Sequence, residues 1–142
     1  MSTQQQQQPA LLQSFRTNYE AYVKAWGKFA TPTERTQLLD TAVTPNMTYT
    51  DPNLHMTDRA ELENLMNTAR KETPDVYFTV DTWQAHHSQG MAEWTAVKEG
   101  KKFLMGTDVV MFDAEGRMTA LHSFFHPIDE KGEKIKQAAT AN

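Results

Sequence analysis

Two acidic residues stand in surroundings where carboxyl groups are uncommon, and both have the chemistry for proton transfer. Asp108 lies in the run FLMGTDVVMF, residues 103–112, which is otherwise almost entirely apolar. Asp51 lies in YTDP, residues 49–52, at the end of a short predicted strand between two predicted helices. Two carboxyl groups whose environments differ can share one site as a base and an acid. If the fold brings them to one apolar cavity, the sequence predicts an acid–base pair.

Asp108 is predicted to be buried whichever way its strand faces. Alternate residues of the run share a face, and both faces are otherwise apolar. A buried carboxyl group needs a partner or becomes neutral, which raises its pKa. A neutral acid can donate a hydrogen bond to an oxyanion that develops during a reaction. The alternative is a structural acid, bonded to a helix N-terminus or to a neighbouring hydroxyl.

Asp51 is predicted to be held at the end of its strand. Pro52 biases the residue before it toward an extended backbone, and strand alternation puts Asp51 on the same face as Tyr49. A carboxylate fixed beside a cavity suits a general base. The alternative is a common Asp-Pro turn, in which the acid accepts hydrogen bonds from its own backbone.

The histidines do not predict a metal site. His86 and His87 are neighbours on a predicted strand and point to opposite faces. His122 and His126 share a face, but four residues of extended chain span about 13 Å. We therefore predict neither a metal nor another cofactor, while His86 or His87 stays open as an acid–base group that reaches a substrate.

Three predicted helices precede the strands. The first, over residues 11–29, carries an apolar stripe that includes Tyr19 and Tyr22, and either hydroxyl could reach a cavity. The second begins at residues 31–34, TPTE, which fit a capping box with proline in the first turn. The third begins at Asp58 and stops before the next proline.

Four predicted strands follow, over residues 76–86, 91–97, 103–112 and 118–126. Their short connections contain Gly90, Gly100 and Gly116, which suit hairpin turns, so neighbouring strands should be antiparallel. Helices followed by a meander of strands predict an α+β fold, with the helices on one face of a curved, mainly antiparallel sheet.

Length and composition set the remaining limits. The 142 residues predict one domain over residues 10–128, between a disordered polar tail at 1–9 and a flexible tail at 129–142. A net charge of −4 without a Lys/Arg cluster argues against nucleic-acid binding. No apolar run reaches the roughly 20 residues of a membrane span. Cysteine is absent and the N-terminus has no signal-peptide pattern, so we expect a cytoplasmic protein.

The chain resembles the cone-shaped α+β barrel of nuclear-transport-factor-type proteins, and within them the SnoaL-like polyketide cyclases and the ketosteroid isomerases. The resemblance covers residues 11–127. The segments that carry it are YTDP, residues 49–52, and DVVMFDAEGRM, residues 108–118.

This resemblance implies roles for individual residues. The family's general base falls on Asp51, and the acid that ketosteroid isomerases keep protonated falls on Asp108. The tyrosine that binds the oxyanion falls on Tyr22, with Tyr19 as the alternative. The aromatic residue at the end of the last strand matches Phe125, with Leu121 and Ser123 on the same inward face.

Two further features bear on the site. Trp94 shares its face with Ala92 and Ala96, which leave room beside the indole for a pocket wall or for a closely packed helix. Epoxide hydrolases of this fold need an arginine paired with the acid, and Gly106 and Thr107 precede Asp108 here, which disfavours that activity.

The leading prediction is a cofactor-independent isomerase or cyclase that abstracts a proton next to a carbonyl of a hydrophobic, polyketide- or terpenoid-like compound. One alternative is a protein of the same fold that binds a small ligand or serves as a scaffold. Another is a dehydratase with His86 or His87 as its base. We also expect a homodimer through the outward face of the last strand, formed by Ala120, His122, Phe124 and His126.

Overall fold

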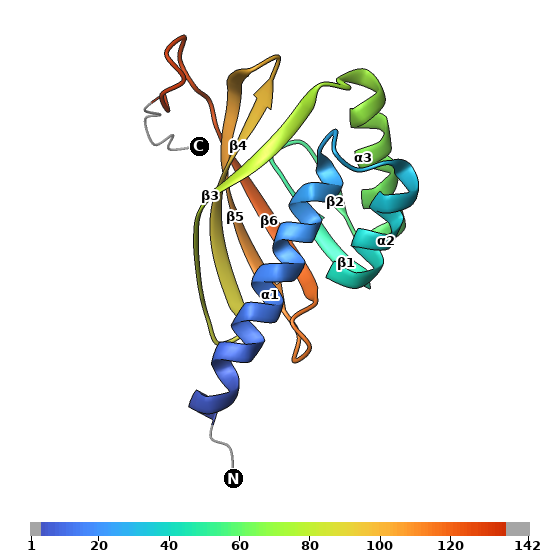
Figure 1. Ribbon diagram of the computed structural model, residues 1–142, viewed down its shortest axis with the longest axis vertical. Helices are drawn as coiled ribbons and strands as arrows, with labels where there is room; N and C mark the ends of the chain where they lie inside the picture. The colour runs from blue at the N-terminus through green and yellow to red at the C-terminus, as the bar shows by residue number, and fades with distance from the viewer. Residues whose placement is uncertain (1–3, 136–142) are drawn as a thin grey trace.

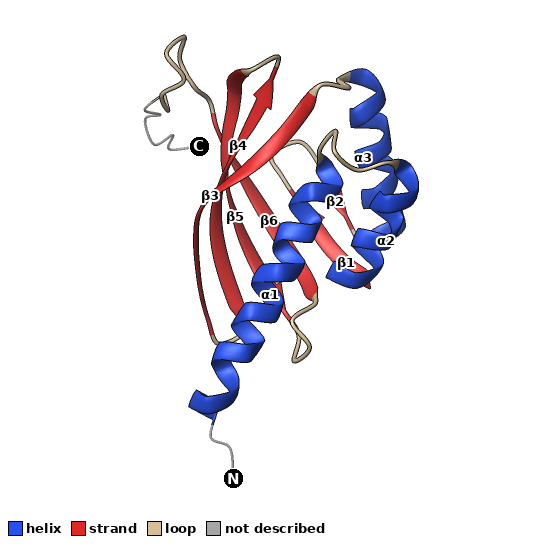
Figure 2. Ribbon diagram, viewed as in Figure 1, coloured by secondary structure: helices blue, strands red, loops and turns tan. Residues whose placement is uncertain are grey.

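A computed structural model describes residues 4–135 as three helices packed on one curved six-stranded sheet (Figures 1 and 2). In chain order the elements are α1 Gln4–Trp26, α2 Pro32–Ala42, β1 Val43–Thr50, β2 His55–Met56, α3 Arg59–Glu72, β3 Val76–His86, β4 Gln89–Lys98, β5 Lys101–Phe112 and β6 Met118–His126. The strand order is β2-β1-β6-β5-β4-β3, so the sheet curves without closing into a barrel. All pairings are antiparallel except β1 with β6, which confirms the predicted fold class.

The starts of α2 and α3 confirm the predicted caps. The Thr31 hydroxyl accepts from the Glu34 amide, and the Glu34 carboxylate accepts from the Thr31 amide, each at 3.1 Å. Asp58 accepts from the Glu61 amide at 2.8 Å. These bonds satisfy N–H groups that would have no partner within the helix.

Helix α1 begins earlier than predicted. Residues 4–9, which the sequence analysis expected to be a disordered polar tail, belong to α1, and residues 1–3 lie outside the described part. Glutamine is a good helix former, and a polar run is therefore compatible with helix. In the predicted C-terminal tail, residues 129–135 form a turn, with a bridge between Ile128 and Lys134. Residues 136–142 lie outside the described part.

The β3–β4 hairpin differs in detail from the prediction. The β3–β4 turn consists of His87 and Ser88, and His87 has a φ of 55°. Gly90, predicted as a turn residue, lies within β4, where an added Cβ would stand 2.3 Å from the Phe15 ring. Its role is to let α1 approach the sheet. Gly100 has the positive φ expected of a hairpin turn, 77°.

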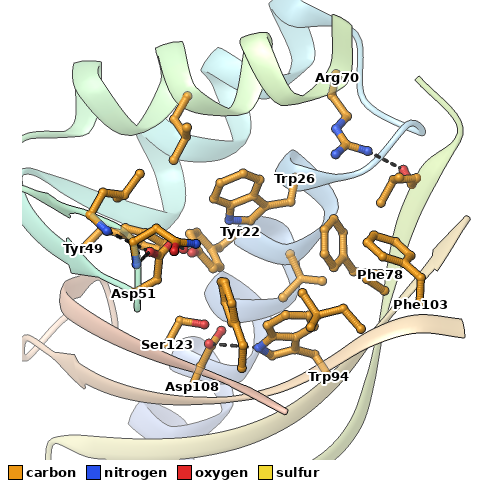
Figure 3. Close-up of a pocket in the computed structure, with 18 residues that line it drawn as sticks. Tyr22, Trp26, Tyr49, Asp51, Arg70, Phe78, Trp94, Phe103, Asp108 and Ser123 are labelled. Atoms are coloured by element: carbon orange, nitrogen blue, oxygen red, sulfur yellow. Dashed lines mark hydrogen bonds between the residues drawn. The ribbon is translucent and has the colours of Figure 1, made fainter. Parts of the chain in front are cut away.

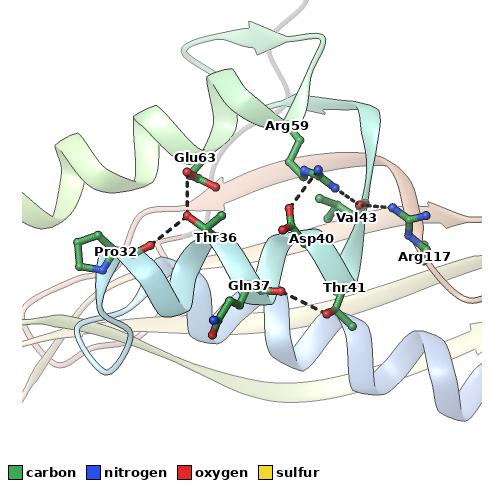
Figure 4. A network of polar contacts seen from close by, with 9 residues as sticks. All are labelled: Pro32, Thr36, Gln37, Asp40, Thr41, Val43, Arg59, Glu63 and Arg117. Carbon is green, nitrogen blue, oxygen red and sulfur yellow. Dashed lines mark hydrogen bonds and ion pairs between the residues drawn. The ribbon is translucent and has the colours of Figure 1, made fainter.

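A polar network fixes the junction where α2 runs into β1 (Figure 4). The Val43 carbonyl accepts from Arg59 Nη1 at 3.1 Å and from Arg117 Nη2 at 3.0 Å. Arg59 also pairs with Asp40 at 3.1 Å. These contacts hold the start of β1 against α3 and the β5–β6 turn, and they thereby aim the strand that ends next to Asp51.

Helix α1 lies across the concave face of the sheet and supplies much of the core (Figure 1). Phe15 and Tyr19 are fully buried, and Phe15 stacks on Phe112 with ring centroids 3.9 Å apart. None of the described helices is long and apolar enough to cross a membrane. The helices and the sheet do not fill the concave space completely, and the space that remains is the candidate site.

Candidate active site

A cavity of about 290 Å³ lies between α1, α3 and the concave face of the sheet (Figure 3). Most of its wall is aromatic or aliphatic. The ionisable and other polar side chains in the wall are few: Tyr22, Tyr49, Asp51, Asn53, Arg70, Asp108 and Ser123. Small-molecule sites usually measure about 300–1,000 Å³ and combine an apolar lining with a few polar groups. The cavity has this composition and lies at the lower end of this size range.

Asp108 lies in the cavity wall with only 4% of its surface exposed. Tyr19 Oη donates to Oδ2 at 2.8 Å, and Trp94 Nε1 donates to Oδ1 at 3.0 Å. Burial raises the pKa of Asp108, while hydrogen bonds from Ser123, Tyr19 and Trp94 oppose that rise without cancelling it. The carboxyl group is therefore biased toward its neutral form, in which it can donate a hydrogen bond.

The contact between Trp94 and Asp108 depends on Gly106. Gly106 on β5 lies opposite Trp94 on β4 in the sheet register. A Cβ on Gly106 would stand 2.1 Å from Cζ2 of Trp94, so the indole lies directly against the glycine backbone. Only glycine at position 106 leaves room for the Trp94 indole in this position, and from there the indole N–H reaches Asp108.

Asp51 lines the same cavity and is half-buried. Its Oδ1 accepts from the amides of Asn53, at 2.7 Å, and Leu54, at 3.1 Å. Its Oδ2 accepts from Tyr49 Oη at 2.8 Å. The predicted turn and the predicted cavity position are therefore both present. The three hydrogen bonds fix the orientation of the carboxyl group beside the cavity.

The buried tyrosines differ in their relation to the cavity. Tyr22 lines the cavity, whereas Tyr19 lies outside the lining and binds Asp108. Burial raises the pKa of Tyr22 well above its ordinary value. Burial likewise raises the pKa of Tyr49 far above its ordinary value. Both phenols therefore stay protonated, and Tyr22 can donate to a ligand.

Of the other predicted site residues, some line the cavity and one does not. Trp94, Ser123 and Phe125, which the sequence analysis placed at a pocket wall or on the inward face of the last strand, line the cavity. Leu121 is fully buried in the core and is not part of the lining. Its side chain points inward as predicted, but other core side chains cover it.

The histidines lie away from this cavity. His86 and His87 are exposed at the β3–β4 turn, where their Nδ1 atoms stand 3.0 Å apart. Neither residue lines the cavity, so the dehydratase interpretation lacks its base there. Within residues 4–135 no group of three or more His, Cys, Asp or Glu could hold a metal ion.

Sequence reasoning missed one charged residue of the cavity, Arg70 on α3. In the sequence it is one of two basic residues in the last turn of a helix. Basic residues are common there because they complement the helix dipole, so this position alone does not indicate a binding site. The aromatic wall formed by Trp26, Phe78 and Phe103 was also not predicted as such.

The family model described as "SnoaL-like domain" matches residues 18–121. The chain belongs to the SnoaL-like family. The match spans most of the described SnoaL-like domain and includes Tyr22, Asp51 and Asp108. It confirms the family to which the sequence resemblance pointed.

Three solved structures illustrate the relationship. A candidate isomerase of the SnoaL-like family from Agrobacterium tumefaciens is 24% identical, with a TM-score of 0.72 over 80% of this chain and 97% of that chain. A candidate SnoaL-like polyketide cyclase from Jannaschia sp. is 9% identical, with a TM-score of 0.65 over 80% and 85%. An LEH-like epoxide hydrolase from M. tuberculosis is 16% identical, with a TM-score of 0.58 over 80% and 83%. No curated protein matches the chain in sequence.

Sequence identities this low support the shared fold only. The activity of this SnoaL-like protein therefore has to be inferred from the residues of its own cavity. Within the part that the structure describes, no Lys or Arg forms an ion pair with Asp108. The position two residues before Asp108 is Gly106, and the Trp94 indole covers it. The arginine that the sequence analysis required beside the acid is therefore not present at this position.

Proposed function

We propose that this SnoaL-like protein is an isomerase or cyclase that abstracts a proton next to a carbonyl group of a small hydrophobic compound. One observation carries the proposal: Asp51 and Asp108 line the same mostly apolar cavity, and Tyr22 lies there with them. Asp108 is biased toward its neutral form by burial, and Asp51 is fixed by three hydrogen bonds.

In the proposed reaction Asp51 removes a proton from the carbon next to the carbonyl. The electron pair of that C–H bond passes to the carbonyl oxygen and gives an enolate. Tyr22 and neutral Asp108 donate hydrogen bonds to this oxygen. Asp51 then returns the proton to another carbon, which is isomerisation. In ring closure, the enolate carbon attacks a second carbonyl carbon instead, and the new alkoxide takes the proton. A positioned base contributes roughly 10²–10⁴-fold to such a rate.

The size of the cavity favours a compact substrate. At about 290 Å³ it is near the lower limit of ordinary ligand sites. This volume suits a compound of one or two rings better than a long polyketide chain. The aromatic side chains of Trp26, Phe78 and Trp94 would contact such rings.

A non-catalytic ligand-binding protein is the second candidate. The observation in its favour is that both acids already have hydrogen-bond partners, as structural acids would. On this alternative, replacing either acid lowers the melting temperature and leaves ligand binding intact. On the proposed function, Asp51→Asn leaves the melting temperature level and removes turnover, because asparagine keeps an acceptor for the turn amides.

Deuterium exchange tests the proposed function without knowledge of the natural substrate. Cyclic and bicyclic ketones are first screened for binding by tryptophan fluorescence. Those that bind are incubated with the protein in D₂O, and deuterium at the α-carbon is followed by NMR. We expect exchange above the buffer rate, lowered at least about 100-fold in Asp51→Asn. Asp58→Asn is the matched control, because this helix cap also accepts from a backbone amide. Bound ketones that exchange no faster than in buffer would contradict the proposal.

We also propose that the chain forms a homodimer through the outer face of the sheet. On the face of β6 that was predicted as the interface, Phe124 is 54% exposed and His122 is exposed as well. Sedimentation should give a dimer at micromolar concentration, and Phe124→Glu should dissociate it. A monomeric wild-type protein would refute this proposal.

A further inference from the structure

The guanidinium of Arg70 lies in the cavity wall without an acidic partner (Figure 3). Its Nη1 donates to the Val76 carbonyl at 2.9 Å, and its Nη2 contacts the Thr73 hydroxyl at 3.4 Å. Its Nε is buried and has no hydrogen-bond partner. Among the described residues no carboxylate lies within 4.0 Å of it. The cation is therefore satisfied only by two neutral oxygen atoms.

This arrangement is costly unless an anion joins it. Burial lowers the pKa of Arg70, and the charge of Arg35 lowers it further, yet an arginine stays protonated in a protein. Partly buried charges are normally paired. The Phe78 ring, with its centroid 5.9 Å from the guanidinium carbon, helps to hold the group in place. A fixed planar guanidinium matches a carboxylate through two parallel hydrogen bonds.

The surroundings of Arg70 on the side away from the cavity are also basic. A second cleft there is lined by Lys28, Arg35, Lys71 and Asn67, and no acidic residue lines it. Asp75 pairs with Lys28 at 2.7 Å, but Arg35 donates only to the carbonyls of Ala25 and Ala30 and to the Asn67 amide oxygen. Arg35 and Lys71 thus bring positive charge beside Arg70, and the charge of Glu63 offsets part of that of Arg35.

We propose that the substrate carries a carboxylate group and that Arg70 binds it. The inference rests on the proposed function, because it places the carbonyl of the same molecule at Tyr22, Asp51 and Asp108. Figure 3 shows Arg70 and Asp51 on opposite sides of Trp26, at two ends of the cavity wall. One end offers a cation without an acidic partner and the other offers two acids. A keto acid can therefore bind in only one direction, with its carboxylate away from the base.

The test uses two ligands of the same shape, 6-hydroxy-2-naphthoate and its carboxamide. In each, the hydroxyl mimics the enolate oxygen at one end, and only the carboxylate carries a charge at the other. Calorimetry at pH 7 should show that the wild type binds the carboxylate at least about tenfold more tightly than the carboxamide, since hydrogen bonds between ionised groups are about twice as strong as neutral ones.

Three variants assign this preference to Arg70. Arg70→Gln should bind both ligands about equally, and Arg70→Lys should keep an intermediate preference, because lysine retains the charge but not the planar fork. Arg16→Gln is the control, since Arg16 pairs with Glu20 on α1 outside the cavity, and it should keep the full preference. Arg70→Lys retains a cation at the site, so it remains informative even if Arg70→Gln unfolds.

Equal binding of the two ligands by the wild type would overturn the inference. So would a carboxylate preference that survives in folded Arg70→Gln. Both outcomes are independent of the deuterium-exchange test, which depends on Asp51. Exchange of neutral ketones without a carboxylate preference would refute the Arg70 site and keep the proposed function. A carboxylate preference without exchange would support Arg70 as an anion site and refute the proposed function.

Discussion

Gly106→Ala tests whether the glycine backbone positions Trp94 against Asp108. The added Cβ would lie 2.1 Å from Cζ2 and 2.3 Å from Cε2 of the indole. Carbon atoms approach no closer than about 3.5 Å without repulsion, so the ring must retreat by roughly 1.4 Å. The Nε1–Oδ1 hydrogen bond measures 3.0 Å, and such a retreat lengthens it beyond a useful distance.

The expected loss of stability follows from these contacts. Overpacking of a filled site costs about 1–3 kcal/mol, and a lost hydrogen bond costs about 1 kcal/mol more. We therefore expect the free energy of unfolding to fall by about 2–4 kcal/mol. If the added Cβ did not collide with the indole, the substitution would instead raise the free energy of unfolding, because replacing glycine by alanine at an unstrained site stabilises a protein by about 0.4–1 kcal/mol.

Urea unfolding measures this change, and the indole N–H signal of Trp94 in NMR spectra reports the hydrogen bond. The protein has three tryptophans, so Trp94→Phe assigns the signal. Gly27→Ala is the matched control, because its nearest neighbour atom would lie at an ordinary 3.4 Å, and it should raise the free energy of unfolding by about 0.4–1 kcal/mol. A Gly106→Ala protein of unchanged or higher stability, with its Trp94 signal in place, would refute the reasoning.

Two further predictions concern the cavity. Burial raises the pKa of Asp108 in the folded protein, so its contribution to stability is complete below its unfolded pKa of about 3.9 and is lost as the pH rises through the folded pKa. The free energy of unfolding of the wild type minus that of Asp108→Asn should therefore decrease from pH 4 upward in denaturant titrations, and an increase would contradict the buried position. Tyr22→Phe removes a donor that burial keeps protonated, so it should weaken binding of 2-naphthol about 3–10-fold, while Tyr77→Phe, outside the cavity, should leave the affinity unchanged.

The sequence was most informative for features that neighbouring residues alone determine, such as burial within a strand or the cap of a helix. Asp108 stands among apolar residues on both faces of its strand, so its burial follows without knowledge of the fold. The caps at Thr31 and Asp58 depend on residues three positions apart and were equally accessible. Strand alternation also puts Tyr49 on the same face as Asp51, and the hydrogen bond between the two side chains is consistent with that shared face.

The rest depends on contacts between distant segments. Tyr19 and Tyr22 share one helical stripe, and only the position of β5 decides that Tyr19 binds Asp108 while Tyr22 lines the cavity. Gly90 resembles a turn glycine in sequence, and its contact with Phe15 needs the docked helix. Arg70 looks like an ordinary helix-end cation, and its lack of an acidic partner appears only when the neighbouring elements are in place.

The central claim is that two acids face one cavity and that burial keeps one of them neutral. Its most direct measurement is a pH titration of the protein labelled with ¹³C at the aspartate carboxyl carbons, with Asp108→Asn to assign the signal. Asp108 should stay protonated above the range in which ordinary aspartates ionise, about pH 3.9. Addition of 2-naphthol should also shift the signals of Asp108 and Asp51 and leave that of Asp58 in place. An Asp108 that ionises at or below the ordinary value, with neither cavity signal responding to the ligand, would contradict the account.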